Sequence, residues 1–217
     1  MGAFTGGLTF RQYYVTEALP EGWKDAFHQA IAQHAFKDID PHTEEERAVG
    51  WCSPHFPLDV ELEQSQYLYN EYLVLALRID TLTVPGPLLR IYSEKESRRV
   101  MAEQKRASLN RYEKAEIKER VKLDLRRKMM ASIKAIDMVW SWSSGTVRFF
   151  STNEKVNLEF MELFESTFGL QLTPEAPYTV ALHGWHTLDD AQKAAIERIE
   201  PESFADADTM LAAMKEV

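Results

Sequence analysis

A stretch with a helical pattern from about residue 88 to residue 107 becomes polar on almost every side. Its later part, "SEKESRRVMAEQKRA", offers only Val100, Met101 and a few alanines for burial. A helix of this kind does not lie in a core; it projects into solvent, packs on one partner or faces a ligand. Asn110 followed by Glu113 is a capping box, which predicts that a second helix begins near Arg111. The sequence therefore predicts a helical hairpin, an arm over 88–131.

The arm also holds most of the positive charge of an acidic chain. The formal net charge of the 217 residues is -9. Residues 90–134 contain 15 Lys and Arg against 7 Asp and Glu, a net of +8, which leaves 10 against 27, a net of -17, for the remainder. An asymmetry of this size suggests a polyanionic partner, although exposed helices also carry many charges without one.

Two side-chain ladders with four-residue steps run along the second helix of the arm. The apolar ladder consists of Ile117, Val121, Leu125, Met129 and Ile133. The cationic ladder consists of Lys114, Lys118, Lys122 and Arg126. Neighbouring positions on a helix lie about 100° apart, so one ladder can dock while the other faces outward.

Long cations in register are the chemistry that phosphate contacts need. The alternative is a solvated helix face on which Glu113, Glu116 and Glu119 pair with the lysines. The cations predicted to contact DNA phosphates are Arg98, Arg99, Lys105, Arg106, Arg111, Lys114, Lys118, Lys122, Arg126, Arg127 and Lys128.

Strand and helix patterns on both sides of the arm predict an α+β fold with mixed or antiparallel sheets, packed helices and the protruding basic helical arm. Strands or extended segments are expected within 3–16, 47–53, 71–84, 132–150 (a hairpin turning at "SSG") and 170–182, and helices within 20–36 and 151–169. The predicted parts are an N-terminal α+β part of the core (1–87), the arm (88–131), a second α+β part (132–182) and an acidic helical tail (183–217).

Other candidate sites have ordinary interpretations. Cys52 is expected to be a buried small side chain. His183 and His186 are three residues apart but lack a third metal ligand nearby. Trp140 and Trp142 share one face of a strand, which suits either base stacking or a core. No catalytic residue, metal or cofactor is predicted, and the chain is not expected to be an enzyme.

Nothing in the sequence predicts a membrane segment or a secretion signal. The longest apolar runs, such as "YLVLAL", are too short to span a bilayer. One cysteine allows no internal disulfide and suggests a reducing compartment. The expected location is the cytoplasm.

The order of motifs resembles the bacterial recombination-associated protein RdgC family over about residues 45–175. The matching stretches are "AVGWCSP", "TVPGPLL", "MAEQKRASLNRYEKAEIKERV" and "STNEKVNLEFMELFESTFGLQLTP". The matching positions are Gly50, Trp51, Pro54, Pro85, Glu113, Lys114, Ile117, Lys118, Val121 and Ser151 through Pro174. The chain departs from the family at residues 126–130, "RRKMM", where members usually carry a Pro-Arg-Ala-Phe-like stretch.

The resemblance implies a ring-shaped homodimer that encircles duplex DNA with little sequence preference, associates with the nucleoid and restrains RecA-type recombinases. The predicted function is thus non-specific double-stranded DNA binding in recombination or replication, by coating or encircling the duplex, with a recombination protein as a further partner. The alternative is a protein–protein interaction module in which the acidic tail docks a partner or occupies the arm. A metal-dependent nuclease ranks lowest.

Overall fold

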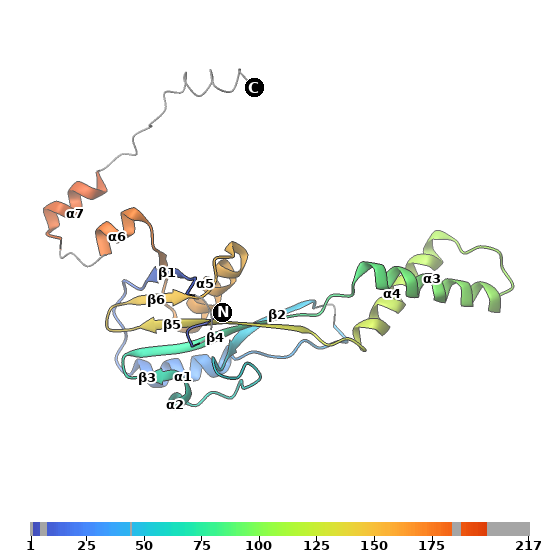
Figure 1. Ribbon diagram of the computed structural model, residues 1–217, viewed down its shortest axis with the longest axis horizontal. Helices are drawn as coiled ribbons and strands as arrows, with labels where there is room; N and C mark the ends of the chain where they lie inside the picture. Colours follow the sequence, from blue (N-terminus) through green and yellow to red (C-terminus); the bar gives the residue numbers. More distant parts are fainter. Residues whose placement is uncertain (1, 5–7, 44, 184–187, 199–217) are drawn as a thin grey trace, which may run out of the picture. The chain divides into compact units, whose positions relative to one another are not determined.

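The computed structural model describes residues 2–4, 8–43, 45–183 and 188–198 (Figure 1). The chain forms two compact units, Met1–Thr173 and Pro174–Val217, which are described separately. A seven-stranded antiparallel sheet with packed helices confirms the predicted α+β fold. The finer division of the chain at residues 87, 131 and 182 stays a prediction.

The first unit is organised around the sheet, whose main path runs in the order β2-β4-β5-β6-β1-β7, with β3 pairing on β4. The strand expected within 3–16 is present, but it covers only the four residues Arg11–Tyr14. The strands are β1 (Arg11–Tyr14), β2 (Arg47–Cys52), β3 (Leu68–Tyr69), β4 (Tyr72–Thr81), β5 (Ser132–Ser141), β6 (Thr146–Phe149) and β7 (Thr173–Pro174). The predicted hairpin is confirmed, since β5 and β6 pair and Gly145 in their turn has a φ of 66°.

The central strands β4 and β5 pair along their whole ten-residue length, from Tyr72 opposite Ser141 to Thr81 opposite Ser132. The chain leaves the sheet after Thr81 and returns at the residue directly across from it. Both ends of the intervening segment are therefore held side by side by the sheet, and the segment between them projects as an arm (Figure 1).

One face of the sheet carries an aromatic core under the helices α1 (Trp23–Gln33) and α5 (Glu154–Phe168). Phe149 of β6 stacks on Phe160 of α5 with ring centroids 4.1 Å apart. The buried Trp51 indole donates a 2.8 Å hydrogen bond to Thr167. The short helix α2 (Gln64–Tyr67) precedes β3. Strand β4 is buried on both faces and is therefore held firmly in the core. The arm leaves the sheet at the end of this strand, so the point of its departure is fixed.

The arm consists of α3 (Gly86–Glu103) and α4 (Arg111–Arg126), as the polar pattern predicted. Its small apolar core is separate from the sheet's core and contains Val84, Leu109, Ile117, Val121 and Leu125. The predicted ladder does not reach Ile133, because α4 ends at Arg126 and Ile133 lies in β5, 45% exposed. The arm is thus a two-helix hairpin closed by a narrow apolar seam.

The base of the arm is fastened to the segment that precedes β2. Arg126 donates to the carbonyl oxygen of Glu45 at 2.5 Å, and Lys122 lies 3.0 Å from the carboxylate of Glu46. This ion pair lowers the pKa of Glu46, chiefly through the hydrogen bond from Lys122. Two cations of the predicted phosphate ladder therefore hold the arm to the rest of the first unit.

The prediction that Arg126 faces outward is wrong, because its side chain is 1% exposed. A four-residue step advances about 400° around a helix, so three steps turn the ladder by about 120° between Lys114 and Arg126. The surroundings of α4 change over the same distance, from solvent near Lys114 to the Glu45–Glu46 segment at the base. Helical periodicity contains no information on that change.

The second unit contains α6 (Pro177–His183) and α7 (Asp190–Glu197). The extended segment expected over 170–182 is wrong beyond β7, because a helix begins at Pro177, a residue well suited to a first helical position. Asp189 caps α7, accepting a hydrogen bond from the backbone of Gln192. The rest of the predicted acidic helical tail, residues 184–187 and 199–217, lies outside the described residues, as does His186.

Replacing Arg126 by Ala should destabilise the fold because it removes a buried side chain and the bond to Glu45. We expect the free energy of unfolding to fall by roughly 1–3 kcal/mol. The exposed neighbour Arg127, with its loose 3.9 Å pair to Asp124, is the matched control, and Arg127→Ala should cost under about 0.5 kcal/mol. Urea unfolding followed by circular dichroism measures both, and equal losses would contradict this role for Arg126.

Candidate nucleic-acid interface

The cations predicted to contact phosphates fall into three groups. Arg126 is buried at the base of the arm. A second group forms ion pairs with carboxylates and consists of Arg98, Arg99, Arg106, Lys122 and Arg127. The third group is exposed and has no ion pair within the part of the chain that the structure describes; it consists of Lys105, Arg111, Lys114, Lys118 and Lys128.

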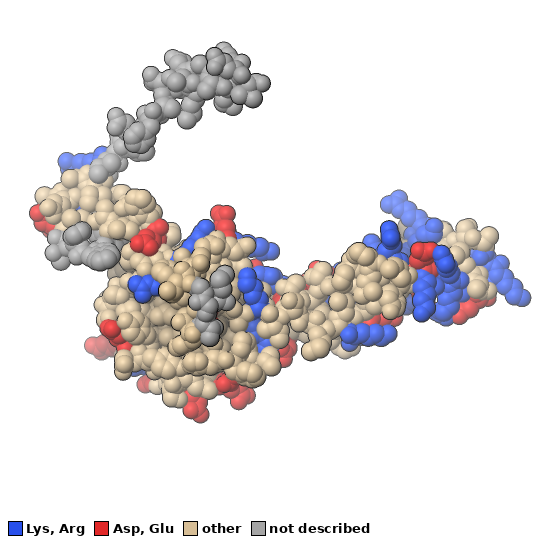
Figure 2. Space-filling model, viewed as in Figure 1, with Lys and Arg blue, Asp and Glu red and all other residues tan. Residues whose placement is uncertain are grey.

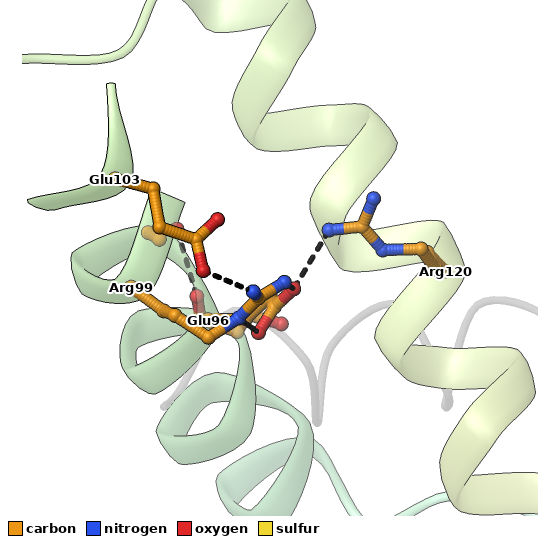
Figure 3. A network of polar contacts seen from close by, with 6 residues as sticks. Glu96, Arg99, Glu103 and Arg120 are labelled. Atoms are coloured by element: carbon orange, nitrogen blue, oxygen red, sulfur yellow. Dashed lines mark hydrogen bonds and ion pairs between the residues drawn. The ribbon is translucent and has the colours of Figure 1, made fainter. Parts of the chain in front are cut away.

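The carboxylate of Glu96 is the hub of an ion-pair network that joins the two helices of the arm (Figure 3). Arg99 approaches it with two nitrogens, at 2.8 and 2.6 Å, and also reaches Glu103 at 2.5 Å. Arg120 crosses from α4 to Glu96 at 2.8 Å. The hydrogen bonds from Arg99, assisted by the charges of both arginines, lower the pKa of Glu96 to about 2. The charges of Arg99 and Arg120 are therefore used in ion pairs that stabilise the packing of α3 against α4.

The turn between α3 and α4 is fixed by Glu113. The predicted capping box is confirmed: the Asn110 side chain accepts from the backbone of Glu113 at 2.9 Å, and the Glu113 carboxylate accepts from the backbone of Asn110 at 2.8 Å. Arg106 also donates to Glu113, at 2.6 Å, and lowers its pKa. Charge at Arg106 is thus already balanced within the turn.

The turn also contains Lys105 in a left-handed conformation, with a φ of 52°. Its backbone N–H bonds to the carbonyl of Ala102, and that of Arg106 to the carbonyl of Met101, which is a Schellman motif at the end of α3. Glycine is the usual residue at such a position, because a side chain there is strained. An exposed lysine occupies it here.

The remaining exposed cations of α4 are concentrated in its first half. By helix geometry, Arg111, Lys114 and Lys118 lie within about 60° of one another around the axis and extend over about 10 Å along it. All three are exposed, whereas Ile117 on the same turn is buried. In the view of Figure 2, Lys and Arg gather toward the outer part of the arm. Together with Lys105, these residues form what we call the outer cation stripe.

The sequence did not reveal that α3 and α4 are joined by Arg120 and Glu96. The spacing of Glu96, Arg99 and Glu103 was a usable signal for pairs within α3, since residues three and four apart are neighbours on a helix. Arg120 lies 24 residues from Glu96 in the sequence. Its pairing depends on how the hairpin packs.

The other candidate sites have structural roles where the structure describes them. Cys52 is fully buried, and burial raises the pKa of its thiol to about 12. Trp140 lies in the core against Phe164 and Phe168, and Trp142 packs on Trp23. His186 is outside the described residues, as is the side chain of His183. Elsewhere in the described chain, no group of three or more His, Cys, Asp or Glu is placed to hold a metal ion.

Among the helices that the structure describes, none is long and apolar enough to cross a bilayer.

Comparison with known proteins does not assign the chain to a family: no family model matches it, and no match was found among curated proteins. The resemblance to the RdgC family therefore stays a prediction. The electrostatics of the arm itself are the basis for any functional proposal.

The Glu96 network should make arm stability depend on pH. Because the pKa of Glu96 is lowered to about 2 from its ordinary value of 4.5, its ion pairs stabilise the fold above pH 4.5, and this stabilisation is lost as the pH falls toward 2. Glu96→Gln should therefore be less stable than wild type at neutral pH, with the difference vanishing in acid. Urea unfolding at a series of pH values measures it. Glu116→Gln, at an exposed carboxylate of α4, is the matched control, and an identical profile for both variants would contradict the role of Glu96.

Proposed function

We propose that this protein binds duplex DNA with little sequence preference, through phosphate contacts made by the outer cation stripe. The observation that carries the proposal is the separation of the arm's cations into an internally paired set and an exposed set. Lys105, Arg111, Lys114 and Lys118 have no ion pair among the described residues, although seven carboxylates lie in the same stretch of sequence, 90–134. Their charge is available to an anionic partner.

Phosphate binding fits this stripe better than the reading of base edges does. Lysines on an exposed helix satisfy the main requirement of backbone contacts, which is several long cations in register. Reading of sequence relies instead on rigid, paired contacts such as those that arginine, asparagine or glutamine make to base edges. Lysine predominates in the stripe, and this supports non-specific binding.

Lys105 adds an independent argument. A residue other than glycine in the left-handed region costs roughly 1–2 kcal/mol. Backbone strain of this kind concentrates at functional sites. A lysine that bears this cost at the exposed turn of the arm supports a role for its charge.

The alternative of a purely solvated helix face accounts for only part of the arm. Glu96, Glu103 and Glu113 engage arginines, as a solvated, ion-paired face requires. Glu116 and Glu119, which the sequence offered as partners for the lysines, form no ion pair within the described structure. The stripe therefore differs from the paired part of the arm.

The resemblance to the RdgC family extends the proposal in several directions. It supports a homodimer that coats or encircles duplex DNA, an association with the nucleoid, and a role in recombination or replication beside a recombination protein. The acidic remainder of the chain, with a net charge of -17, would confine DNA contact to the arm by repelling phosphates elsewhere.

The test is the salt dependence of binding to a fluorescent duplex, measured by anisotropy over a series of KCl concentrations. Four contacted phosphates give a slope of log K against log salt of about -3.6. Lys114→Ala/Lys118→Ala should weaken binding by about tenfold or more at low salt and reduce the slope by about 1.8. Duplexes of different sequence should behave alike.

The matched control is Lys37→Ala/Lys155→Ala, which removes the same charge from exposed positions outside the arm. Its affinity and slope should stay close to those of wild type. Equal weakening in both double variants would contradict the stripe as the DNA site, and wild-type binding that is insensitive to salt would contradict phosphate contacts altogether.

A further inference from the structure

The arm also contains an apolar groove between its two helices, away from the outer cation stripe. The groove has a volume of about 570 Å³. Its apolar lining comes from both helices and from the residues just after α4, and consists of Leu88, Tyr92, Val121, Leu125 and Met129. None of the stripe residues contributes to it.

The groove exposes apolar surface in an otherwise charged segment. Tyr92 is 44% exposed, and Leu88 and Met129 are partly exposed. Contiguous apolar surface with a polar rim is typical of protein interaction sites. A groove between two packed helices suits the apolar face of a third helix, which binds through side chains at i, i+3 or i+4, and i+7.

The rim of the groove determines which helix fits. Glu96, Arg99 and Arg120 lie along it, and their charges balance only together with that of Glu103, in the network described above. Lys95 and Lys128 also line the groove, are exposed, and have no ion pair among the residues described. Asp124 is the remaining acidic residue of the lining and is near Arg127. The unbalanced charge of the rim is positive.

We infer that this groove is a docking site for an acidic amphipathic helix of a partner protein. The apolar face of that helix lies on Leu88, Tyr92 and Met129, and its flanking Asp or Glu side chains pair with Lys95 and Lys128. The positive charges of Lys95 and Lys128 at the rim favour approach of an acidic segment and disfavour a basic one. The arm then has two separate surfaces, an outer stripe and a groove that receives protein.

The test uses the full chain and a fluorescein-labelled synthetic peptide with Leu at i, i+3, i+4 and i+7 and Glu at the flanking positions. A peptide of the same composition in scrambled order has the same charge but no apolar face. Anisotropy at moderate salt should show binding of the amphipathic peptide and about tenfold weaker binding of the scrambled one.

Two variants locate the site. Lys95→Glu/Lys128→Glu should weaken peptide binding by about tenfold, because both rim charges become repulsive. Lys114→Glu/Lys118→Glu makes the same change of charge on the outer stripe and should have less than about a twofold effect. Tyr92→Ala tests the apolar lining without changing charge and should weaken binding by at least about fivefold. Circular dichroism verifies that each variant keeps its helices.

Three results would overturn the inference. The first is equal affinity for the scrambled peptide, which would indicate non-specific charge attraction. The second is wild-type affinity in Lys95→Glu/Lys128→Glu or in Tyr92→Ala. The third is self-association in analytical ultracentrifugation that Tyr92→Ala abolishes and the peptide does not inhibit, which would show that a second copy covers the groove. Because DNA binding depends on other lysines, it can fail or succeed independently of these outcomes.

Discussion

The pairing of β4 with β5 holds the sheet and the arm together. The two strands match residue for residue over their full length, and the last pair, Thr81 with Ser132, brings the two ends of the arm together. A hairpin with so small an apolar core could not hold its position alone. The sheet holds its ends, and Arg126 and Lys122 fasten its base to the segment before β2. A highly charged element can therefore extend from the sheet.

The cations of the arm fall into two sets: one is buried or ion-paired within the protein, and the other is exposed without an ion pair among the described residues. The arginines, together with Lys122, mostly stabilise: Arg99 and Arg120 meet at Glu96, Arg106 holds the turn, and Arg126 is buried. Arginine suits this work because its planar group binds a carboxylate with two nitrogens at once. Lys105, Lys114 and Lys118 remain exposed. An arm held together by its own ion pairs can present these lysines at low cost in conformational entropy.

Features set by local chemistry could be predicted from the sequence, and features set by packing could not. The β4 strand, the capping box at Asn110 and the absence of a large core in the arm follow from nearby residues. The burial of Arg126 was missed because it depends on the Glu45–Glu46 segment, some 80 residues away in the sequence. The link from Arg120 to Glu96 was missed for the same reason. The sequence identified the four cations of the ladder, but only the two in its outer half, Lys114 and Lys118, are exposed to solvent.

Lysine acetylation footprinting tests whether the outer lysines contact DNA. The protein is acetylated with and without duplex DNA, and the modification of each lysine is quantified by mass spectrometry. We expect DNA to protect Lys105, Lys114 and Lys118 from acetylation, while Lys37 and Lys155 react equally in both samples. Outer lysines that react as fast with DNA as without it, or protection spread evenly over all exposed lysines, would contradict such contact.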